Sequence, residues 1–356
     1  MCALFAGSAI ADDRKPLFQD HEVVKAVLTA PISQTYAQRH SDIRLYFPGQ
    51  FAYIDAAGEP QRLEVSIRIR RNFRKNYCEL PPIRLNFKKK QVEGTVFAGQ
   101  DKLKLVGPCQ HGLKSQQALL LEFMAYRIYE ILTDQSFGAR LFRLSYVDSD
   151  EKLKSWTDLA FVIEDEKDIG KRLGLDKANV AKNQFEDLDQ RSTALFELFQ
   201  LMISNHDYSV LQGPAGEYCC HNAVIYTREE AADKRIPIPY DFDMSGLVDA
   251  EYAAPPSHLP IRLVRTRFYR GLCQPPEVLE GALAPGEAAS RCPAGAPAGK
   301  AARRAPRPAA ADVLRMMHDE GVILVEQRRV GTEGRLEQRA NALVALVPAE
   351  NAEPHE

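Results

Sequence analysis

The sequence predicts an α+β protein in which an antiparallel sheet with one buried helix comes first, a mainly helical part follows, and a low-complexity tail ends the chain. Three observations lead to this prediction. Short runs within residues 63–106 alternate between apolar and polar side chains, as half-buried strands do. Residues 116–133 are apolar nearly all round, as in a buried helix. Between residues 284 and 311, 20 of 28 residues are Ala, Pro or Gly, so this segment has too little apolar surface to fold.

The expected elements follow one another along the whole chain. Turn residues at 56–60 predict a hairpin between the strands on either side of them. Two more alternating strands follow, and then the buried helix. The expected segments are, in order, "FAYID" and "LEVSIRIR" (the hairpin), "IRLNF", "KLKLV", the helix 116–133, strands at 139–148 and 158–169, a second apolar helix at 185–204, and short strands at 221–226 and 236–243.

Size and charge limit the classes of function. The chain has 356 residues, 45% of them hydrophobic, which is enough for two packed parts. A formal net charge of −2 gives no general attraction to nucleic acid. No apolar run reaches the roughly 18 residues that a membrane span needs. We therefore expect a monomer with no nucleic-acid partner and no membrane span.

The N-terminus predicts export. Residues 1–11 are apolar and end in Ala-Ile-Ala, which looks like the tail of a secretory signal peptide with an A-x-A cleavage site. A ragged apolar N-terminus is the alternative interpretation. Export would make the protein extracytoplasmic, either periplasmic or secreted.

The cysteines fit the same prediction. Cleavage after residue 11 would leave six of the seven cysteines, which is consistent with disulfides in an oxidising compartment. We predict a Cys78–Cys109 disulfide, because Cys78 lies near the strand that leads to Cys109. We also predict a link from Cys219 or Cys220 to Cys273.

A carboxylate inside the buried helix needs a partner. Glu122 lies in an apolar stripe, and burying it alone would cost several kcal/mol. Lys102 and Lys104 share one face of the preceding strand and can supply the positive charge. The alternative is that Glu122 reaches solvent at the helix edge. Residues 64–104 hold eleven Lys and Arg against four Asp and Glu, which indicates either a solvated basic face or a surface that receives phosphate.

Two carboxylates end the last predicted strand. In an extended segment Asp241 and Asp243 point to the same side, with Phe242 opposite. Their mutual repulsion must be offset, and burial makes it worse. Water offsets it if the segment is an exposed turn, and Mg²⁺ offsets it if the two aspartates form a metal site.

The polar residues occur in an order that suits phosphoryl transfer. A strand lysine comes first, followed by a helix glutamate, an Asn-His-Asp at 205–207, an asparagine before a strand, and Asp-Phe-Asp. Over residues 67–273 the sequence resembles the atypical protein-kinase-like family typified by spore coat protein H (CotH-like). The segments that carry the resemblance are "IRLNF", "KLKLV", "LEFMAYRIYEIL", "FVIEDEKDI", "ISNHDYS", "HNAVIY" and "IPYDFDMSG".

The resemblance implies a two-lobed kinase-like fold. Residues 12–165 would form an N-terminal lobe with an antiparallel sheet and the buried helix. Residues 166–283 would form a mainly helical C-terminal lobe with the catalytic and metal loops, and 284–356 a poorly packed tail. The sequence departs from ordinary kinases in three respects. It has no G-x-G-x-x-G loop, Asn222 comes 15 positions after Asp207, and the motif that ends in Asp207 is Asn-His-Asp and not His-Arg-Asp.

The resemblance also implies a role for each candidate residue, with ATP and Mg²⁺ as cofactors. The implied roles are phosphate contact for Lys104 or Lys102, helix partner of that lysine for Glu122, catalytic aspartate for Asp207, metal ligands for Asn222, Asp241 and Asp243, and nucleotide-binding hinge for Glu164 and Asp165.

Three functions remain open from the sequence. The first is a secreted kinase-fold enzyme that transfers phosphate from ATP–Mg to a protein hydroxyl. The second is a non-catalytic relative that acts as an envelope or surface interaction protein. The third is a zinc hydrolase built on His206, Cys219 and His221.

Overall fold

The computed structural model describes residues 14–41, 43–70, 73–228 and 231–283, together with the backbones of two short strands further on. The chain divides into two units, residues 1–305 and residues 306–356. In the second unit β11 (Leu324–Val325) and β12 (Val344–Ala345) form one antiparallel pair. The predicted signal peptide lies outside the described residues, and so does the predicted tail apart from these two strands.

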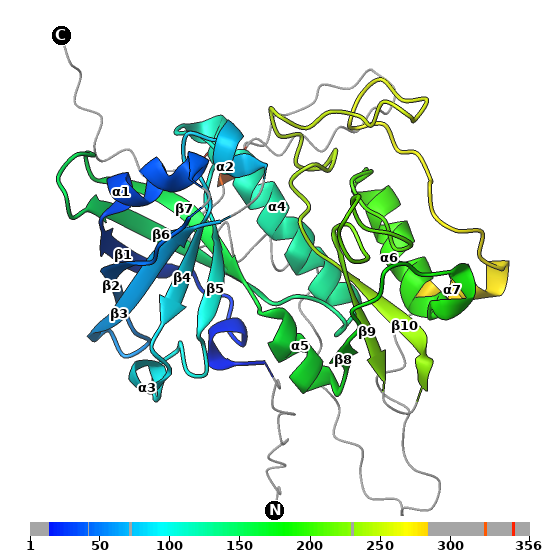
Figure 1. Ribbon diagram of the computed structural model, residues 1–356, viewed down its shortest axis with the longest axis horizontal. Coiled ribbons are helices and arrows are strands. Elements are labelled where there is room, and N and C mark those ends of the chain that lie inside the picture. The colour runs from blue at the N-terminus through cyan, green and yellow to red at the C-terminus, as the bar shows by residue number, and fades with distance from the viewer. Residues whose placement is uncertain are drawn as a thin grey trace, which may run out of the picture. The chain divides into compact units, whose positions relative to one another are not determined.

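Seven strands of the first unit close into a barrel (Figure 1). Around the barrel their order is β1-β2-β3-β4-β5-β7-β6. Six neighbouring pairs are antiparallel, and β1 closes the barrel by pairing in parallel with β6. The strands are β1 (Val24–Ala30), β2 (Phe47–Ile54), β3 (Pro60–Ile69), β4 (Ile83–Phe87), β5 (Lys102–Val106), β6 (Ala139–Asp148) and β7 (Trp156–Ile163).

The closed barrel shows that the two-lobed kinase-like fold predicted from the resemblance is wrong. The sheet was predicted as an antiparallel sheet of one lobe, whereas the observed sheet closes into a barrel and includes one parallel pair. The cause is β1, for which the sequence analysis predicted no strand. Its seven residues alternate between buried and more exposed positions, and they pair with β2 on one side and β6 on the other. One additional strand therefore joins the two edges of the predicted sheet, which leaves no edge.

Most of the individual elements are confirmed. The β2–β3 hairpin, β4, β5, β6 and the buried helix α4 (Leu113–Leu132) all occur where they were expected. The segment 158–169 instead divides into the end of β7 and the start of α5 (Glu166–Leu173). The second apolar helix, α6 (Gln190–Met202), begins later than expected because the Asp189 side chain caps it by accepting from the Ser192 N–H. The remaining helices are the short α1 (Ile32–Ala37), α2 (Arg74–Tyr77), α3 (Lys89–Val92) and α7 (Pro276–Leu283).

The barrel interior is an apolar core. The inward-facing residues of β1 to β7 are almost all aliphatic or aromatic and fully buried. Phe51 lies at its centre, with ring centroids 5.8 Å from Phe87, 5.4 Å from Phe97 and 6.0 Å from Phe142, all edge-on. Such edge-to-face contacts favour one packed arrangement over many. The barrel thus holds its strands in fixed register, and polar residues alternate with the core residues on its outer face.

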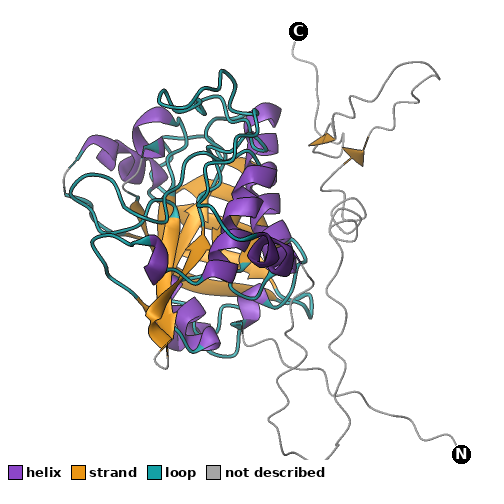
Figure 2. Cartoon of the chain, turned by 90° about the vertical axis from the view of Figure 1, so that its right-hand side faces the viewer, coloured by secondary structure: helices purple, strands orange, loops and turns teal. Residues whose placement is uncertain are grey.

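Helix α4 lies between the barrel and a second, three-stranded sheet (Figure 1). In the turned view of Figure 2, helices lie in front of the strands. This sheet has the order β10-β9-β8, with β8 (Asp176–Lys177), β9 (Ala223–Arg228) and β10 (Ala231–Pro239). Tyr126 of α4 packs on Phe161 of β7 and, at 4.7 Å between ring centroids, on Phe242 just after β10. Helix α4 therefore fixes the end of β10 against the barrel.

No helix among the described residues is both long and apolar enough to span a membrane.

One predicted disulfide is confirmed and the other is wrong. Cys78 is bonded to Cys109, which ties the chain after α2 to the chain after β5. Cys219 is bonded to its neighbour Cys220, while Cys273 is exposed and carries no disulfide. The disulfides are compatible with an extracytoplasmic protein.

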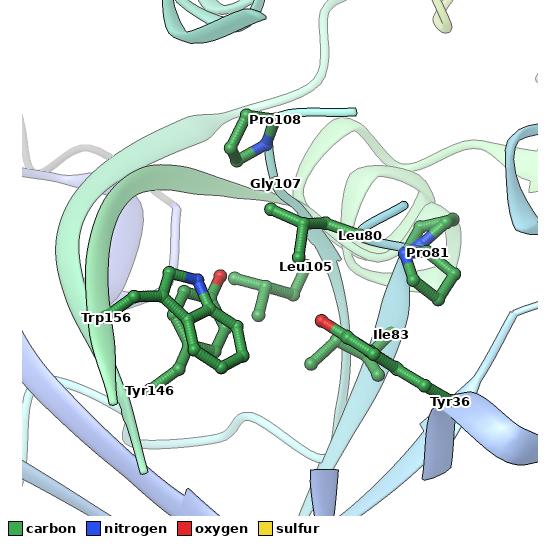
Figure 3. A pocket seen from close by; sticks show the side chains of 10 residues that line it. Tyr36, Leu80, Pro81, Ile83, Leu105, Gly107, Pro108, Tyr146 and Trp156 are labelled. Carbon is green, nitrogen blue, oxygen red and sulfur yellow. The ribbon is translucent and has the colours of Figure 1, made fainter. Parts of the chain in front are cut away.

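A small apolar pocket is lined by residues of α1, of the segment before β4, and of the strands β4 to β7 with the loop after β5 (Figure 3). It contains none of the candidate site residues. Its lining is Tyr36, Leu80, Pro81, Pro82, Ile83, Leu105, Gly107, Pro108, Tyr146 and Trp156.

The Cys78–Cys109 disulfide should stabilise the fold measurably. It closes a loop of 31 residues, and chain entropy predicts a loss of about 3–4 kcal/mol in the free energy of unfolding when both cysteines become serine. Urea unfolding under non-reducing conditions measures this loss. The matched control, Cys273→Ser, should change stability by less than about 0.5 kcal/mol. A double variant as stable as the wild type would show that the disulfide contributes nothing.

Candidate functional site

The β9–β10 hairpin brings two candidate metal ligands to the same end of a sheet. Ala223 is paired with Pro239, so Asn222 precedes β9 at the point where Asp241 follows β10. The Tyr240 N–H donates to the Asn222 carbonyl at 3.2 Å, which extends the pairing by one step. Asn222 and Asp241 both have left-handed backbones, with φ of 51° and 62°. Such conformations cost free energy in residues other than glycine and concentrate at functional sites.

Asp207 joins Asn222 at this end of the hairpin. Its carboxylate is held on both oxygens, because Oδ1 accepts from His221 Nε2 at 2.8 Å and Oδ2 from Asn222 Nδ2 at 2.9 Å. Asn222 Nδ2 also donates to the Asp207 carbonyl. The Asp207 side chain is still 37% exposed. The predicted catalytic aspartate is therefore held in one orientation and remains accessible to a ligand.

Helix α4 supplies the opposite wall of the site. Tyr126 Oη accepts the Asp241 N–H at 2.8 Å, and Glu122 lies one helical turn earlier. Glu122 is buried, as predicted, and its positive partner is Arg74 at 3.6 Å. Burial and the neighbouring charge of Asp243 raise the pKa of Glu122 well above its usual range, although Arg74 opposes the rise.

The Asp-Phe-Asp segment is not a solvated turn. Phe242 and Asp243 are buried, and Tyr252 Oη donates to Asp243 Oδ2 at 2.8 Å. Burial raises the pKa of Asp243 to about 7, and the charge of Asp241 adds to the rise. The two carboxylates therefore repel each other in a poorly hydrated place. A bound cation would lower the pKa of Asp243 and relieve this repulsion.

Lys104 reaches the site, but with a different partner from the one predicted. Its ammonium pairs with Glu166 at 3.1 Å and lies 5.1 Å from the centroid of the Tyr240 ring. The prediction that Lys104 pairs with Glu122 is therefore wrong. Burial lowers the pKa of Lys104, while Glu166 and the more distant Asp241 act against this. Lys102 is exposed two residues earlier on β5, and its side chain makes no hydrogen bond or ion pair with another described residue.

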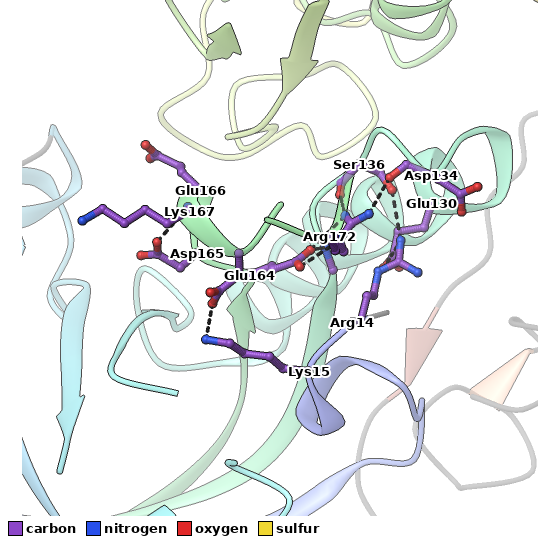
Figure 4. Close-up of polar contacts among 12 residues, drawn as sticks. Arg14, Lys15, Glu130, Asp134, Ser136, Glu164, Asp165, Glu166, Lys167 and Arg172 are labelled. Atoms are coloured by element: carbon purple, nitrogen blue, oxygen red, sulfur yellow. Dashed lines mark hydrogen bonds and ion pairs between the residues drawn. The ribbon is translucent and has the colours of Figure 1, made fainter. Parts of the chain in front are cut away.

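The two predicted hinge residues have structural roles (Figure 4). Glu164 is buried and accepts from Arg172 on both carboxylate oxygens, at 2.9 and 3.0 Å, and from the Gly138 N–H. Asp165 caps α5 by accepting from the Lys167 N–H. The Glu164 carboxylate is therefore buried and accepts three hydrogen bonds within the protein, which gives it a structural role.

The donor groups suit Mg²⁺ when it is bound together with a phosphate. Among the described residues, no three His, Cys, Asp or Glu side chains are arranged to hold a metal ion. In the same part of the chain, no side-chain hydrogen bond or ion pair reaches the Asp241 carboxylate, and none reaches Asn222 Oδ1. Mg²⁺ is commonly bound by one or two protein oxygens plus substrate phosphates. The site therefore fits a metal carried by a nucleotide and does not fit a metal bound alone.

The contacts do not support the zinc interpretation. His206 is buried, and its Nε2 lies 2.8 Å from the Thr266 carbonyl oxygen. Cys219 is bonded to Cys220, which removes its thiolate, while His221 is hydrogen bonded to Asp207. These three residues therefore face different partners.

Sequence reasoning missed several residues of the site. Arg74, Glu166 and His221 were not assigned to a phosphate or carboxylate site, although each contacts a candidate residue. The basic run at residues 68–75 and the His-Asn pair at 221–222 were signals that could have found two of them.

The chain matches no protein-family model and no curated protein sequence. The CotH-like resemblance therefore stays a prediction.

The His221–Asp207 pair should make stability depend on pH. The hydrogen bond that His221 donates to Asp207 raises the pKa of His221 above its ordinary value of 6.5, with burial acting against the rise. The pair's contribution is therefore complete below pH 6.5 and disappears as the pH rises through the raised pKa. Replacing His221→Gln should lower the free energy of unfolding more at about pH 6 than at about pH 9.

Urea unfolding at the two pH values measures this difference. His258→Gln, at an exposed position, is the matched control and should show the same small effect at both. An equal loss for His221→Gln at both pH values would contradict the proposed pairing.

Proposed function

We propose that this protein is a magnesium-dependent phosphotransferase that moves a phosphate from a nucleoside triphosphate to a hydroxyl group. One observation carries the proposal. Asp207, held on both oxygens and accessible, adjoins Asn222, whose side-chain oxygen is uncommitted among the described residues, and Asp241 lies at the same end of the hairpin. An acceptor-orienting carboxylate beside metal-binding oxygens is what phosphoryl transfer requires of a protein.

The residues would divide the work as follows. Asp207 orients the acceptor hydroxyl and takes its proton as the oxygen bonds to phosphorus and the bond to the leaving phosphate breaks. Asp241 and Asn222 would hold Mg²⁺, with Asp243 as a further oxygen ligand. Bound there, the ion would neutralise charge on the phosphates. Lys104 keeps donors beyond the one used by Glu166 and would contact the same phosphates.

The setting and the acceptor belong to the same proposal. The Cys78–Cys109 disulfide supports an extracytoplasmic place of action, periplasmic or secreted. The CotH-like resemblance supports ATP as the donor and a protein hydroxyl as the acceptor. The proposal rests on the site residues and makes no use of a kinase-like fold.

A non-catalytic interaction protein is the second candidate, and two observations favour it. Lys104 is engaged by Glu166, which also pairs with Lys177. The Glu164 carboxylate, predicted to contribute to the nucleotide hinge, is engaged by Arg172. A protein of this kind would bind nucleotide weakly or without transfer.

Two aspartate variants should separate metal binding from transfer. Asp241→Asn should weaken Mg²⁺-dependent ATP binding at least tenfold, because it removes a charged metal ligand. Asp207→Asn should keep ATP affinity within about fivefold but abolish transfer, because an amide oxygen can still accept from Asn222 but cannot take the proton of the acceptor hydroxyl. Titration calorimetry with ATP–Mg²⁺ and a phosphorylation assay measure the two effects.

The control for these variants is Asp249→Asn. Asp249 also has a positive φ, of 50°, but it is exposed and its ion pair is with Arg265. It should behave as the wild type in both assays. Mg²⁺ without nucleotide should give no binding heat. If Asp241→Asn binds ATP–Mg²⁺ as the wild type does, the metal role of Asp241 is wrong. If the wild type binds ATP–Mg²⁺ but transfers nothing, the second candidate is correct.

A further inference from the structure

Three barrel strands place basic side chains in one row across the outer face. In the register of β3, β4 and β5, Arg68 lies opposite Arg84, and Arg84 lies opposite Lys104. Their neighbours Ile67, Leu85 and Leu103 point into the core, so the basic residues point outward. Like charges directly opposite each other on adjacent strands are destabilising. Three in succession therefore need an explanation beyond solubility.

Neutralisation by the protein is incomplete along this row. Lys104 is paired with Glu166, and the Arg68 guanidinium lies over the Tyr46 ring at 4.5 Å. Arg84, in contrast, has no ion pair or side-chain hydrogen bond with any described residue, and the same holds for the Arg70 side chain. Arg84 in the row and Arg70 next to it are therefore two guanidinium groups that make no ion pair or hydrogen bond with a described residue.

Arg70 lies where the row meets the candidate site. It follows β3 immediately, two residues after Arg68 and on the same face. Burial lowers the pKa of Arg70, the charge of Asp241 opposes this, and the nearby charges of Arg84 and Arg74 add to the lowering. The charge of Arg70 also acts to lower the pKa of Lys104, and the charge of Asp241 acts to raise it. The Arg70 N–H also donates to the Pro82 carbonyl at 3.0 Å, which continues the pairing of β3 with β4. Arg70, Arg84 and Lys104 thus lie at neighbouring positions of one face, and the charge of Asp241 acts on both Arg70 and Lys104.

We propose that Arg70, Arg84 and Lys104 together bind a polyphosphate chain, and that they bind it without a metal ion. The proposal deepens the proposed function, on which it rests for the identity of the donor, by assigning the donor's phosphates to these three residues. Adjacent strands are about 4.8 Å apart, so Arg84 and Lys104 can contact neighbouring phosphates of one chain. Arginine binds phosphate through two parallel hydrogen bonds, which gives orientation as well as charge.

The length of the row limits the ligand. Three cations suit a short chain, whereas a nucleic acid backbone needs a longer basic surface, and the net charge of the whole chain is −2. The neighbouring Asp241 would repel the end of the chain unless a metal ion lies between them. The row therefore binds the phosphates, and the metal adds affinity at the end nearest Asp241.

Sodium tripolyphosphate in the presence of EDTA tests this proposal by titration calorimetry, with orthophosphate as the short comparison. The wild type should bind tripolyphosphate at least tenfold more tightly than orthophosphate. Arg84→Gln and Arg70→Gln should each weaken tripolyphosphate binding at least tenfold, since each removes charge-assisted hydrogen bonds. Arg84→Lys, which keeps the charge, should lose less than Arg84→Gln.

The matched control is Arg68→Gln. Arg68 lies on β3 two residues before Arg70 and on the same face, but its guanidinium lies over the Tyr46 ring. Arg68→Gln should bind tripolyphosphate within about threefold of the wild type. Thermal melting of each variant shows that it is folded. The proposal is overturned if the wild type fails to bind tripolyphosphate or binds orthophosphate equally well. It is also overturned if folded Arg84→Gln and Arg70→Gln bind tripolyphosphate as the wild type does. A single-stranded oligonucleotide that binds to the row more tightly than tripolyphosphate would overturn it as well.

The outcome is separable from that of the proposed function. If tripolyphosphate binds in EDTA and this binding depends on Arg84 and Arg70, the polyphosphate site is supported even when no transfer from ATP–Mg²⁺ occurs. If Arg84→Gln and Arg70→Gln transfer phosphate from ATP–Mg²⁺ as the wild type does, the proposed polyphosphate site is wrong and the proposed phosphotransferase function still stands.

Discussion

The antiparallel register of β9 and β10 is the constraint on which the candidate site depends. It pairs Ala223 with Pro239 and so places Asn222 beside the segment that carries Asp241. Asn222 holds Asp207 by donating two hydrogen bonds to it, and α4 contacts the hairpin where the Tyr126 hydroxyl accepts the Asp241 N–H. A slip of one residue in the hairpin would turn these side chains to the other face of the sheet. The loop that carries Asp207 and the helix α4, which are far apart in the sequence, thus meet at the same end of the β9–β10 hairpin.

Electrostatics make this arrangement costly without a ligand. Glu122 and Asp243 are buried near Asp241, and burial raises the pKa of both buried carboxyls, with Arg74 as the principal counter-charge. On the barrel side, the side chains of Arg70 and Arg84 make no ion pair with a described residue, although the charge of Asp241 acts to raise the pKa of Arg70. Buried acids with one principal counter-charge thus adjoin two arginines without an ion pair. A ligand that combines phosphates with a divalent cation would satisfy both halves, which is why the two excesses of charge suggest one ligand.

The sequence was sufficient to predict single strands and helices, and insufficient to predict which residues far apart in the chain pair with each other. Alternation and apolar runs located β4, β5, β6 and α4, since each depends on its own residues. The closure of the barrel depends on β1 pairing with β6, whose partner residues lie 118 positions further on (Val24 with Phe142), and no local pattern specifies that parallel partner. The partner of Lys104 was mistaken for the same reason. Which acid reaches it depends on how α5 begins beside the barrel, and there Glu166 is available whereas Glu122 already pairs with Arg74.

The central claim is that Asp241 and Asn222 hold a metal ion together with nucleotide phosphates. A crystal structure of the protein with a non-hydrolysable nucleoside triphosphate and Mn²⁺ tests it directly, because Mn²⁺ replaces Mg²⁺ at oxygen ligands and its anomalous scattering locates it independently of the protein. The predicted result is one Mn²⁺ peak in contact with the Asp241 carboxylate, Asn222 Oδ1 and phosphate oxygens. A bound nucleotide whose Mn²⁺ lies away from both residues would contradict the claim.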